Sequence, residues 1–398
     1  MTSPSHQKAG LSAAAETSTA QVSLSAVALV FLKLGTIAFG GPAAHIAMME
    51  DEFVTRRRWL TREQFLDRLG AANLIPGPSS TEMAIFIGYE KRGWPGLLVA
   101  GCAFLLPAAI MVGAIASAYV RYGTLPQVNG ILYALKPVVI AVIIQAFWKL
   151  ARTAMKSIWL AVVGSVAALL YVLRVHEVLL LAIAAALAGA PMLYEKLTRL
   201  RKTTAGVLTL PKLTHLLGAA GAVAIPVGPW RLFLVFAKIG AVLFGSGYVL
   251  LAFLRADLVD RLHWLSERQL LDAVAVGQVT PGPVFTTATF IGYIIGGVPG
   301  AVVATVGIFA PGFVYVALSG FLIPRIRRSR VAASMLDGVV VGSLALMGVV
   351  AWQLGRVAII DVPTLVIAGI SAALLLRFQV NSAWLIVVAG AFGWLYRG

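Results

Sequence analysis

The chain has 398 residues, of which 60% are hydrophobic and only 12% charged, and its mean hydropathy is +0.90. Soluble domains are about a quarter charged, so this composition excludes a soluble globular protein and predicts an all-α protein that crosses a membrane many times. The net charge of +16 does not indicate nucleic-acid binding, because the basic residues lie in loops beside apolar stretches and are not interleaved with aromatic residues.

The first twenty residues are rich in Ala, Ser and Thr, and no basic patch is followed by an apolar core. They resemble a disordered tail and not a signal peptide, so the first apolar span is expected to target the chain. The single cysteine, Cys102, lies in an apolar span, which excludes a disulfide framework and a thiolate metal cluster. The sequence calls for no cofactor and no metal.

Apolar windows of about 20 residues, enough to cross a hydrocarbon core of about 30 Å, recur along the chain and predict five spans in each half. The predicted spans are 24–43, 96–120, 128–150, 158–173 and 178–194, then 232–251, 300–323, 331–354, 357–376 and 383–396. The predicted domains are a tail (1–20), a first membrane repeat (21–195), a basic linker (196–230) and a second membrane repeat (231–398).

The two halves repeat one order of residues. Phe31-Leu32-Lys33-Leu34-Gly35 recurs as Phe236-Ala237-Lys238-Ile239-Gly240, and Pro76-Gly77-Pro78 recurs as Pro281-Gly282-Pro283. Further pairs match in the same order, among them Gly88 with Gly292, Tyr89 with Tyr293, and Pro107 with Pro311. Apolar stretches that are interrupted by Gly and Pro at corresponding places are typical of a secondary transporter whose site lies between its repeats.

Loop charges predict that the repeats have inverted topology. The loop after the second span carries Arg121 in the first copy and Arg325, Arg327, Arg328 and Arg330 in the second. The next loop carries Lys149, Arg152 and Lys156 in the first copy and Arg356 in the second. Under the positive-inside rule, corresponding loops therefore face opposite sides. This scheme needs each Pro-Gly-Pro segment to enter and leave on one side; if the segments span fully, about twelve crossings replace ten, and the side of the termini stays open.

The Pro-Gly-Pro segments are the predicted substrate site. Two prolines forbid a continuous helix, so each segment is expected to form a half-helix, a tight turn and a second half-helix. Broken backbone survives in a membrane only inside the protein or beside a water-filled cavity, and the new helix start offers free N–H groups to an anion. The candidate residues are Asn73, Pro76, Gly77, Pro78, Ser79, Ser80 and Thr81 in the first copy, and Gln278, Pro281, Gly282, Pro283, Thr286 and Thr287 in the second.

Each first span adds one interruption and one lysine. The small residues at the interruptions let backbone approach backbone or ligand. They are Gly40 and Gly41 in the first copy, and Gly245, Ser246 and Gly247 in the second. Lys33 and Lys238 lie about two turns earlier, where a charge costs roughly 2.5 to 3.5 kcal/mol near the bilayer centre. We expect them to attract an anionic substrate; the alternative is that they snorkel to the interface.

Glu82 and His45 are the candidates for proton coupling. Glu82 is the only acid close to a turn, and its alternative role is a solvated helix-start carboxylate. His45 follows the first interruption, and its alternative place is the membrane interface. Lys136 in the third span is matched by Val340 and is a weaker candidate. The charged residues 50–58 with the following Trp-Leu pair predict an amphipathic surface helix anchored by tryptophan.

Together these motifs resemble the chromate ion transporter family in its long two-domain form. The resemblance covers nearly the whole chain and rests on Phe39-Gly40-Gly41-Pro42 with His45-Ile46, Trp59-Leu60, Pro76-Gly77-Pro78 with Thr81, and Gly88-Tyr89 up to Pro107. It implies a multi-pass protein of the bacterial inner membrane that exports chromate and confers resistance. The second copy reads Gly245-Ser246-Gly247 in place of Gly40-Gly41-Pro42, which puts the equivalence of the two half-sites in doubt.

The predicted function is efflux of chromate or another tetrahedral oxyanion, driven by membrane potential, proton exchange or both. An inside-negative potential of 100 mV gives a departing dianion about 4.6 kcal/mol. Sulfate transport is the nearest alternative, because the charge, size and acceptor atoms are almost the same.

The five histidines are scattered and no HExxH or GxSxG motif occurs, which argues against an enzyme. A scaffold is disfavoured by the paired broken helices. The expected partners are the oxyanion and the lipid bilayer; a homodimer and the coupling ion stay open.

Overall fold

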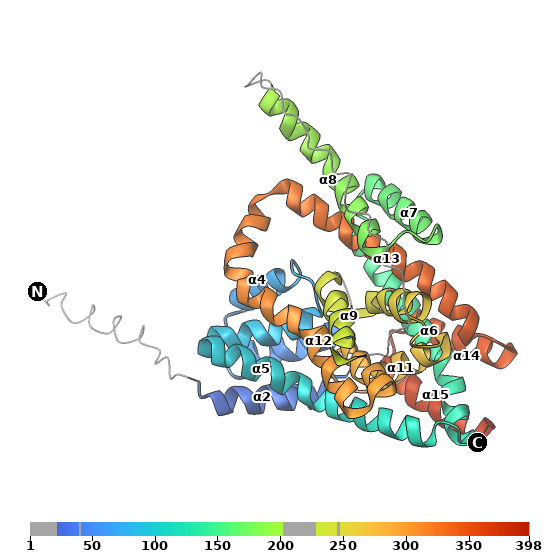
Figure 1. The fold of residues 1–398 in the computed structure, drawn as a ribbon. Coiled ribbons are helices and arrows are strands. Elements are labelled where there is room, and N and C mark those ends of the chain that lie inside the picture. The colour runs from blue at the N-terminus through green and yellow to red at the C-terminus, as the bar shows by residue number, and fades with distance from the viewer. Residues whose placement is uncertain (1–21, 40, 202–227, 245–246, 398) are drawn as a thin grey trace, which may run out of the picture.

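The computed structural model describes residues 22–39, 41–201, 228–244 and 247–397, and within them it is all-α (Figure 1). The first repeat contains α2 (Leu24–Ile37), α3 (Gly41–Glu50), η1 (Asp51–Arg56), α4 (Arg62–Ala72), α5 (Ser79–Tyr122), α6 (Pro126–Ala154), α7 (Ile158–Val172) and α8 (Glu177–Arg201). The second contains α9 (Pro229–Val242), η2 (Gly247–Val249), α10 (Leu250–Leu254), η3 (Arg255–Arg261), α11 (Glu267–Val279), η4 (Val284–Thr286), α12 (Thr287–Arg328), α13 (Arg330–Ala358), α14 (Val362–Arg377) and α15 (Ser382–Arg397). The helices of the first half recur in order in the second, which confirms the predicted two-repeat, all-α membrane fold.

In the described part of the chain, five helices are long and apolar enough to cross a membrane: α5, α6, α8, α12 with η4, and α13. The shorter apolar helices α2, α7, α14 and α15 coincide with other predicted spans. The predicted span 24–43 is interrupted, because α2 ends at Ile37 and α3 begins at Gly41. The predicted tail lies outside the described residues, as does most of the linker, and residues 196–201 of that linker form the end of α8.

Each long helix that follows a Pro-Gly-Pro turn bends sharply. The bend in α5 is at Gly93, where φ is +57°, and the bend in α12 is at Gly297, where φ is +62°. Glycine adopts these backbone angles without steric cost. The short arm before each bend folds back on the long arm after it, and glycine backbones touch across the bend between Gly88 and Gly96 and between Gly292 and Gly300. The turn is thereby held inside the bundle.

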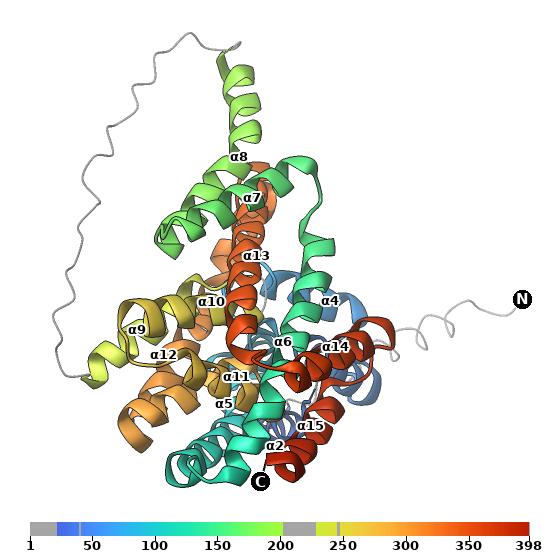
Figure 2. The ribbon, with the colours of Figure 1, turned by 90° about the vertical axis from the view of Figure 1, so that its right-hand side faces the viewer.

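The two repeats are intertwined. In the first repeat α6 packs against α14 and α15 of the second, and in the second repeat α13 packs against α7 and α8 of the first (Figure 2). The equivalent helices also meet each other, α5 against α12 and α6 against α13. Reciprocal contacts of this kind are what an approximate twofold axis produces. Each repeat therefore completes the core of the other.

The segment predicted as an amphipathic surface helix packs against the first span. Residues Asp51–Arg56 form the π-helix η1, in which Glu52 and Phe53 are buried. The Phe53 ring lies 5.1 Å from the ring of Phe31 on α2 and stacks on Trp59 at 5.2 Å. The segment is therefore helical and amphipathic as predicted, with Asp51 and Arg56 exposed, but its apolar side packs against α2 and Trp59 stacks on that contact; its place at a membrane surface stays a prediction.

Gly35 and Gly240 permit close contact between the first and second spans of each repeat. A Cβ atom at Gly35 would run into the backbone carbonyl of Phe104 on α5, and one at Gly240 into that of Ile308 on α12. Alanine is normally a better helix former than glycine by about 1 kcal/mol. At these two positions alanine should instead lower the stability of the protein, because overpacking of this kind costs about 1 to 3 kcal/mol.

We therefore expect Gly35→Ala and Gly240→Ala each to lower the apparent melting temperature of the purified protein in detergent. Gly113→Ala and Gly369→Ala are the matched controls, because an added Cβ at either position meets nothing within 4 Å. The controls should keep or raise the melting temperature. Equal shifts in both sets would contradict the packing described here.

Candidate functional site

The Pro-Gly-Pro segments form tight turns between helices, as predicted. Turn 1, residues 73–79, joins α4 to α5 and contains Pro76 and Pro78; turn 2, residues 278–284, joins α11 to η4 and contains Pro281 and Pro283. The central glycines have left-handed backbones, with φ of +130° at Gly77 and +101° at Gly282. Such angles favour glycine over every residue that has a Cβ atom.

Each turn is hydrogen-bonded to the interrupted first span of the other repeat. The Gly77 amide donates to the Leu243 carbonyl, just beyond α9, and the Gly282 amide donates to the Ala38 carbonyl, just beyond α2; both distances are 2.8 Å. Leu243 and Ala38 occupy equivalent positions in the two copies, as do the two glycines. Backbone groups that the interruptions and turns release therefore satisfy each other across the repeat boundary.

Turn 1 presents hydroxyl and amide groups at a helix start. The N-cap of α5 is Pro78, whose side chain makes no capping hydrogen bond. Ser79 follows it, and its Oγ donates to Asn73 Oδ1 across the turn at 3.0 Å. Thr81 is buried, and its Oγ1 has no partner among the described residues. The positive end of the α5 dipole thus lies beside polar side chains that can still bind a ligand.

His45 connects the interruption of α2 to the start of α5. Its Nε2 lies 2.9 Å from the Ala38 carbonyl oxygen and its Nδ1 lies 3.3 Å from Ser80 Oγ. A carbonyl oxygen only accepts, so Nε2 donates to Ala38, and the Nδ1 of the neutral ring accepts from the Ser80 hydroxyl. His45 is 1% exposed, so it is buried within the protein, and its depth in the membrane stays a prediction.

Glu82 lies buried beneath turn 1. It is 0% exposed, and neither carboxyl oxygen has a hydrogen-bond partner among the described residues. A Cβ on Gly77 would collide with Glu82 Oε1, and one on Gly312 of α12 would lie 3.2 Å from the same atom. The carboxyl group is therefore held between turn 1 and the opposite repeat, and the alternative of a solvated helix-start carboxylate was wrong. Gly312 could not be identified from the sequence, because its role depends on this contact between the repeats.

A cavity of about 360 Å³ lies at turn 1. Asn73, Gly77 and Ser79 line it from the turn. Lys156 and Asp337 line it from the α6–α7 corner and from α13, and their side chains form an ion pair with an Nζ–Oδ1 distance of 2.7 Å. From the sequence, Lys156 was expected only as a loop charge that sets the topology, and its place beside the turn was not predicted.

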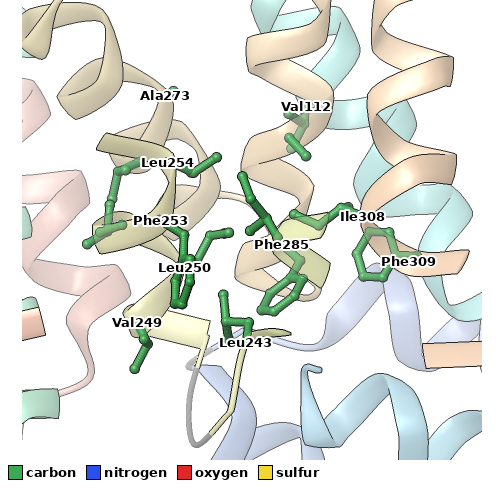
Figure 3. Close-up of a cluster of buried hydrophobic side chains, with 14 of the residues drawn as sticks. Val112, Leu243, Val249, Leu250, Phe253, Leu254, Ala273, Phe285, Ile308 and Phe309 are labelled. Carbon is green, nitrogen blue, oxygen red and sulfur yellow. The ribbon is translucent and has the colours of Figure 1, made fainter. Parts of the chain in front are cut away.

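Turn 2 is more apolar and more enclosed. Val284 and Phe285 stand where the first copy has two serines, and they are 6% and 0% exposed. Figure 3 shows the Phe285 ring among other buried side chains, including Leu243 and Leu250. Thr286 Oγ1 donates to the Pro283 carbonyl at 2.8 Å. Buried polar atoms without a hydrogen-bond partner among the described residues also occur here, Gln278 Nε2 and Thr287 Oγ1. The two half-sites therefore differ in chemistry.

Lys33 and Lys238 each pair with a carboxylate beyond the interruption. The Nζ of Lys33 lies 3.6 Å from Glu52 Oε2, and that of Lys238 lies 2.5 Å from Asp257 Oδ2. Asp257 also accepts from Arg261. These equivalent pairs fasten α2 to η1 and α9 to η3, and they compensate both ammonium charges. Attraction of a substrate by these lysines stays a prediction.

Three predicted site residues, Gly40, Gly245 and Ser246, lie outside the described residues. Gly41 begins α3 with φ of +78°, and an added Cβ would lie 3.4 Å from the Tyr248 hydroxyl oxygen of the second repeat. Gly247 begins η2, directly before Tyr248. The interruptions of the two first spans thus approach each other through Tyr248, a neighbour that the sequence analysis did not identify.

Comparison with known proteins gives one consistent result. The family model described as chromate transporter matches twice, over residues 25–190 and 230–394. A chromate transport protein of Cupriavidus metallidurans is 32% identical over 372 residues, which is 91% of this chain and 90% of that protein. A probable chromate transport protein of Synechococcus elongatus is 31% identical over 88% of this chain and 89% of its own length. A chromate transport protein of Pseudomonas aeruginosa is 30% identical, with coverage of 92% and 90%. No solved structure matches.

The link made by His45 can be tested by stability. His45→Ala removes two hydrogen bonds and leaves a cavity, so we expect a loss of about 2 to 4 kcal/mol, seen as a lower apparent melting temperature. His45→Gln should recover part of the loss, because its amide can donate to the Ala38 carbonyl. Leu250→Ala, at the equivalent position of the second copy, is the control for lost packing alone. A His45→Ala protein as stable as the parent would refute the link.

Proposed function

We propose that this chain, which belongs to the chromate transporter family, carries chromate across the membrane along the boundary between its two repeats. The observation that carries this proposal is the reciprocal bonding of each Pro-Gly-Pro turn to the interrupted span of the other repeat. Paired discontinuous helices near a repeat boundary are the usual place for the substrate of a secondary transporter. The loop charges favour inverted repeats, and a twofold exchange of contacts is compatible with that topology.

Turn 1 has the chemistry that a tetrahedral oxyanion needs. Chromate is a dianion whose four oxygens accept hydrogen bonds. The Asn73 amide nitrogen and the start of α5 can supply donors and a positive helix end, and the Ser79 hydroxyl can supply another when its O–H turns from Asn73 Oδ1 to the anion. Lys156 adds a cation at the rim of the same cavity, where it is 60% exposed. An anion that enters the cavity can therefore exchange water for these donors.

Glu82 is suited to couple a proton to this movement. An ionised carboxylate without a partner is costly to bury, so an enclosed Glu82 is best accommodated with a proton bound. When water reaches the turn, the proton can leave, and the resulting charge would repel a bound oxyanion. Loss of the proton would then weaken the binding of the anion at turn 1. Thr287, the equivalent residue, cannot perform this exchange.

Efflux is the direction that the membrane potential favours. A dianion that leaves a cell with an inside-negative potential gains about 2.3 kcal/mol per charge per 100 mV. Uptake of the same ion would need a compensating proton or sodium flux. We therefore place the protein in a bacterial inner membrane, where outward chromate transport would confer resistance. Sulfate has the same charge and geometry, so it is the competitor that the experiment must include.

Radiolabelled chromate flux in proteoliposomes tests this function. We expect flux that responds to an imposed potential, and we expect Ser79→Ala and Asn73→Ala to raise the KM for chromate about tenfold, since each removes a donor to a charged ligand. Ser165→Ala is the matched control, because that hydroxyl donates only to the Ala161 carbonyl one turn earlier on α7. Excess sulfate measures selectivity. Absence of chromate flux from correctly folded protein would refute the proposal.

Glu82→Gln tests the coupling. The amide keeps the shape of the protonated acid but cannot release a proton, so the variant should transport chromate down a potential while losing acceleration by an imposed pH gradient. Thr287→Val removes a buried hydroxyl at the equivalent position and should keep the pH response. Flux in Glu82→Gln that still follows the pH gradient would assign proton coupling to another group.

A further inference from the structure

A buried ion pair fastens the helix before turn 2 to the first repeat. The Nζ of Lys136, on α6, lies 2.9 Å from Asp272 Oδ1 on α11, and the two side chains are only 14% and 3% exposed. The Tyr119 hydroxyl on α5 donates to Asp272 Oδ2 at 2.9 Å. One carboxylate therefore connects two helices of the first repeat to a helix of the second.

The corresponding place in the other copy cannot form this arrangement. The residue equivalent to Asp272 is Asp67 on α4, which is exposed and lies 3.6 Å from its neighbour Arg68. The positions that correspond to Lys136 and Tyr119 hold Val340 and Ile323, which have no charge or hydroxyl to offer. The attachment is thus specific to the side of the molecule that contains turn 2.

Turn 1 is also more accessible than turn 2, the turn on the side of the ion pair. Ser79 lines the cavity at turn 1, whereas its equivalent, Val284, is buried. Val340, the counterpart of Lys136, also lines the turn 1 cavity. Under the approximate twofold relation, Lys136 would line the corresponding cavity at turn 2 if that turn were open. In the enclosed state Lys136 is therefore bound to Asp272, whereas in an open turn 2 it would face the cavity.

We propose that Lys136, Asp272 and Tyr119 form a latch that keeps turn 2 closed, and that Lys136 binds the oxyanion at turn 2 when the latch opens. This inference rests on the proposed function for the identity of the ligand. Its physical basis is that a buried ammonium group needs an anionic partner at every stage. Asp272 is that partner in the closed state, and the transported dianion replaces it in the open state. Opening of turn 2 is thereby tied to the presence of substrate.

Cysteine accessibility tests the latch without any substrate. In a Cys102→Ala background, Val284→Cys reports on turn 2 and Ser79→Cys on turn 1, each by its rate of reaction with a hydrophilic maleimide in proteoliposomes permeabilised to the reagent. The double change Lys136→Met with Asp272→Asn removes the latch and leaves no unpaired buried charge. We expect it to raise the Val284→Cys rate about tenfold, since a latch of this kind biases the closed state. The Ser79→Cys rate should stay within about twofold.

The matched control is the double change Lys156→Met with Asp337→Asn, which removes the ion pair beside turn 1. It should leave the Val284→Cys rate unchanged. The latch is overturned if the Lys136→Met, Asp272→Asn protein is folded, as judged by gel filtration and melting temperature, and labels at the parental rate. Equal acceleration by both double variants would overturn it too, because the effect would then not be specific to the buried pair.

Chromate flux tests the binding role of Lys136 separately. The Lys136→Met, Asp272→Asn variant lacks both the latch and the Lys136 ammonium group. Its KM for chromate should rise about tenfold or more, as expected for loss of a charged contact. Lys136→Arg in the otherwise unchanged protein keeps the charge and should keep the KM within a few fold. A parental KM in the unlatched double variant would overturn the binding role. If the parent shows no chromate flux, the proposed function fails, while the labelling rates still decide the latch.

Discussion

Backbone amides and carbonyls that are freed inside a bilayer must find partners, and the rest of this structure depends on how they do so. Each repeat has a span that stops early and a proline turn that cannot form regular hydrogen bonds. Gly77 donates to Leu243 and Gly282 donates to Ala38, so each repeat supplies the acceptor that the other lacks. Since the bonds run in both directions, neither half can satisfy its own broken backbone. Whole helices depend on the other repeat in the same way, because α6 and α13 each pack against helices of the opposite repeat.

The two repeats share one backbone arrangement but have different side chains at their turns, and this difference bears on the mechanism. Two identical half-sites would bind a substrate equally well and would give the molecule no reason to prefer one state. Here the open cavity, the serine residues and Glu82 belong to turn 1, whereas Val284, Phe285 and the Lys136–Asp272 pair belong to turn 2. The two turns can therefore have different free energies of opening on one backbone plan. A ligand that binds one turn more tightly than the other can then shift the balance between the two states.

The sequence predicted the helices, the interruptions and both turns, because apolar length, Gly and Pro act locally and recur in the two copies. It could also have revealed the partners of Lys33 and Lys238, since an acid follows each lysine at the same spacing. The burial of His45 and Glu82, the space at Gly312 and the exchange of hydrogen bonds between repeats were out of reach. These features join residues far apart in the chain, and no local pattern encodes which repeat supplies the partner. The contact of Phe53 with α2 was out of reach for the same reason, because the charge pattern of residues 50–58 does not say which helix their apolar side meets.

The pairing of the lysines near the turns bears on how a dianion can leave the protein. A fixed, unpaired ammonium in a dry site would attract a dianion strongly enough to slow its release, and transport requires binding that is firm on entry and weak on exit. Turn 1 offers hydroxyls, an amide and a helix start, which are dipoles and not full charges. The lysines that lie near the turns are each matched with a carboxylate, Lys156 with Asp337 and Lys136 with Asp272. A lysine with such a partner can return to it when the anion departs, so the energy of the lost contact is recovered within the protein. On this argument the acidic partners are as necessary to anion transport as the basic residues, because they set the limit on how tightly the ion is held.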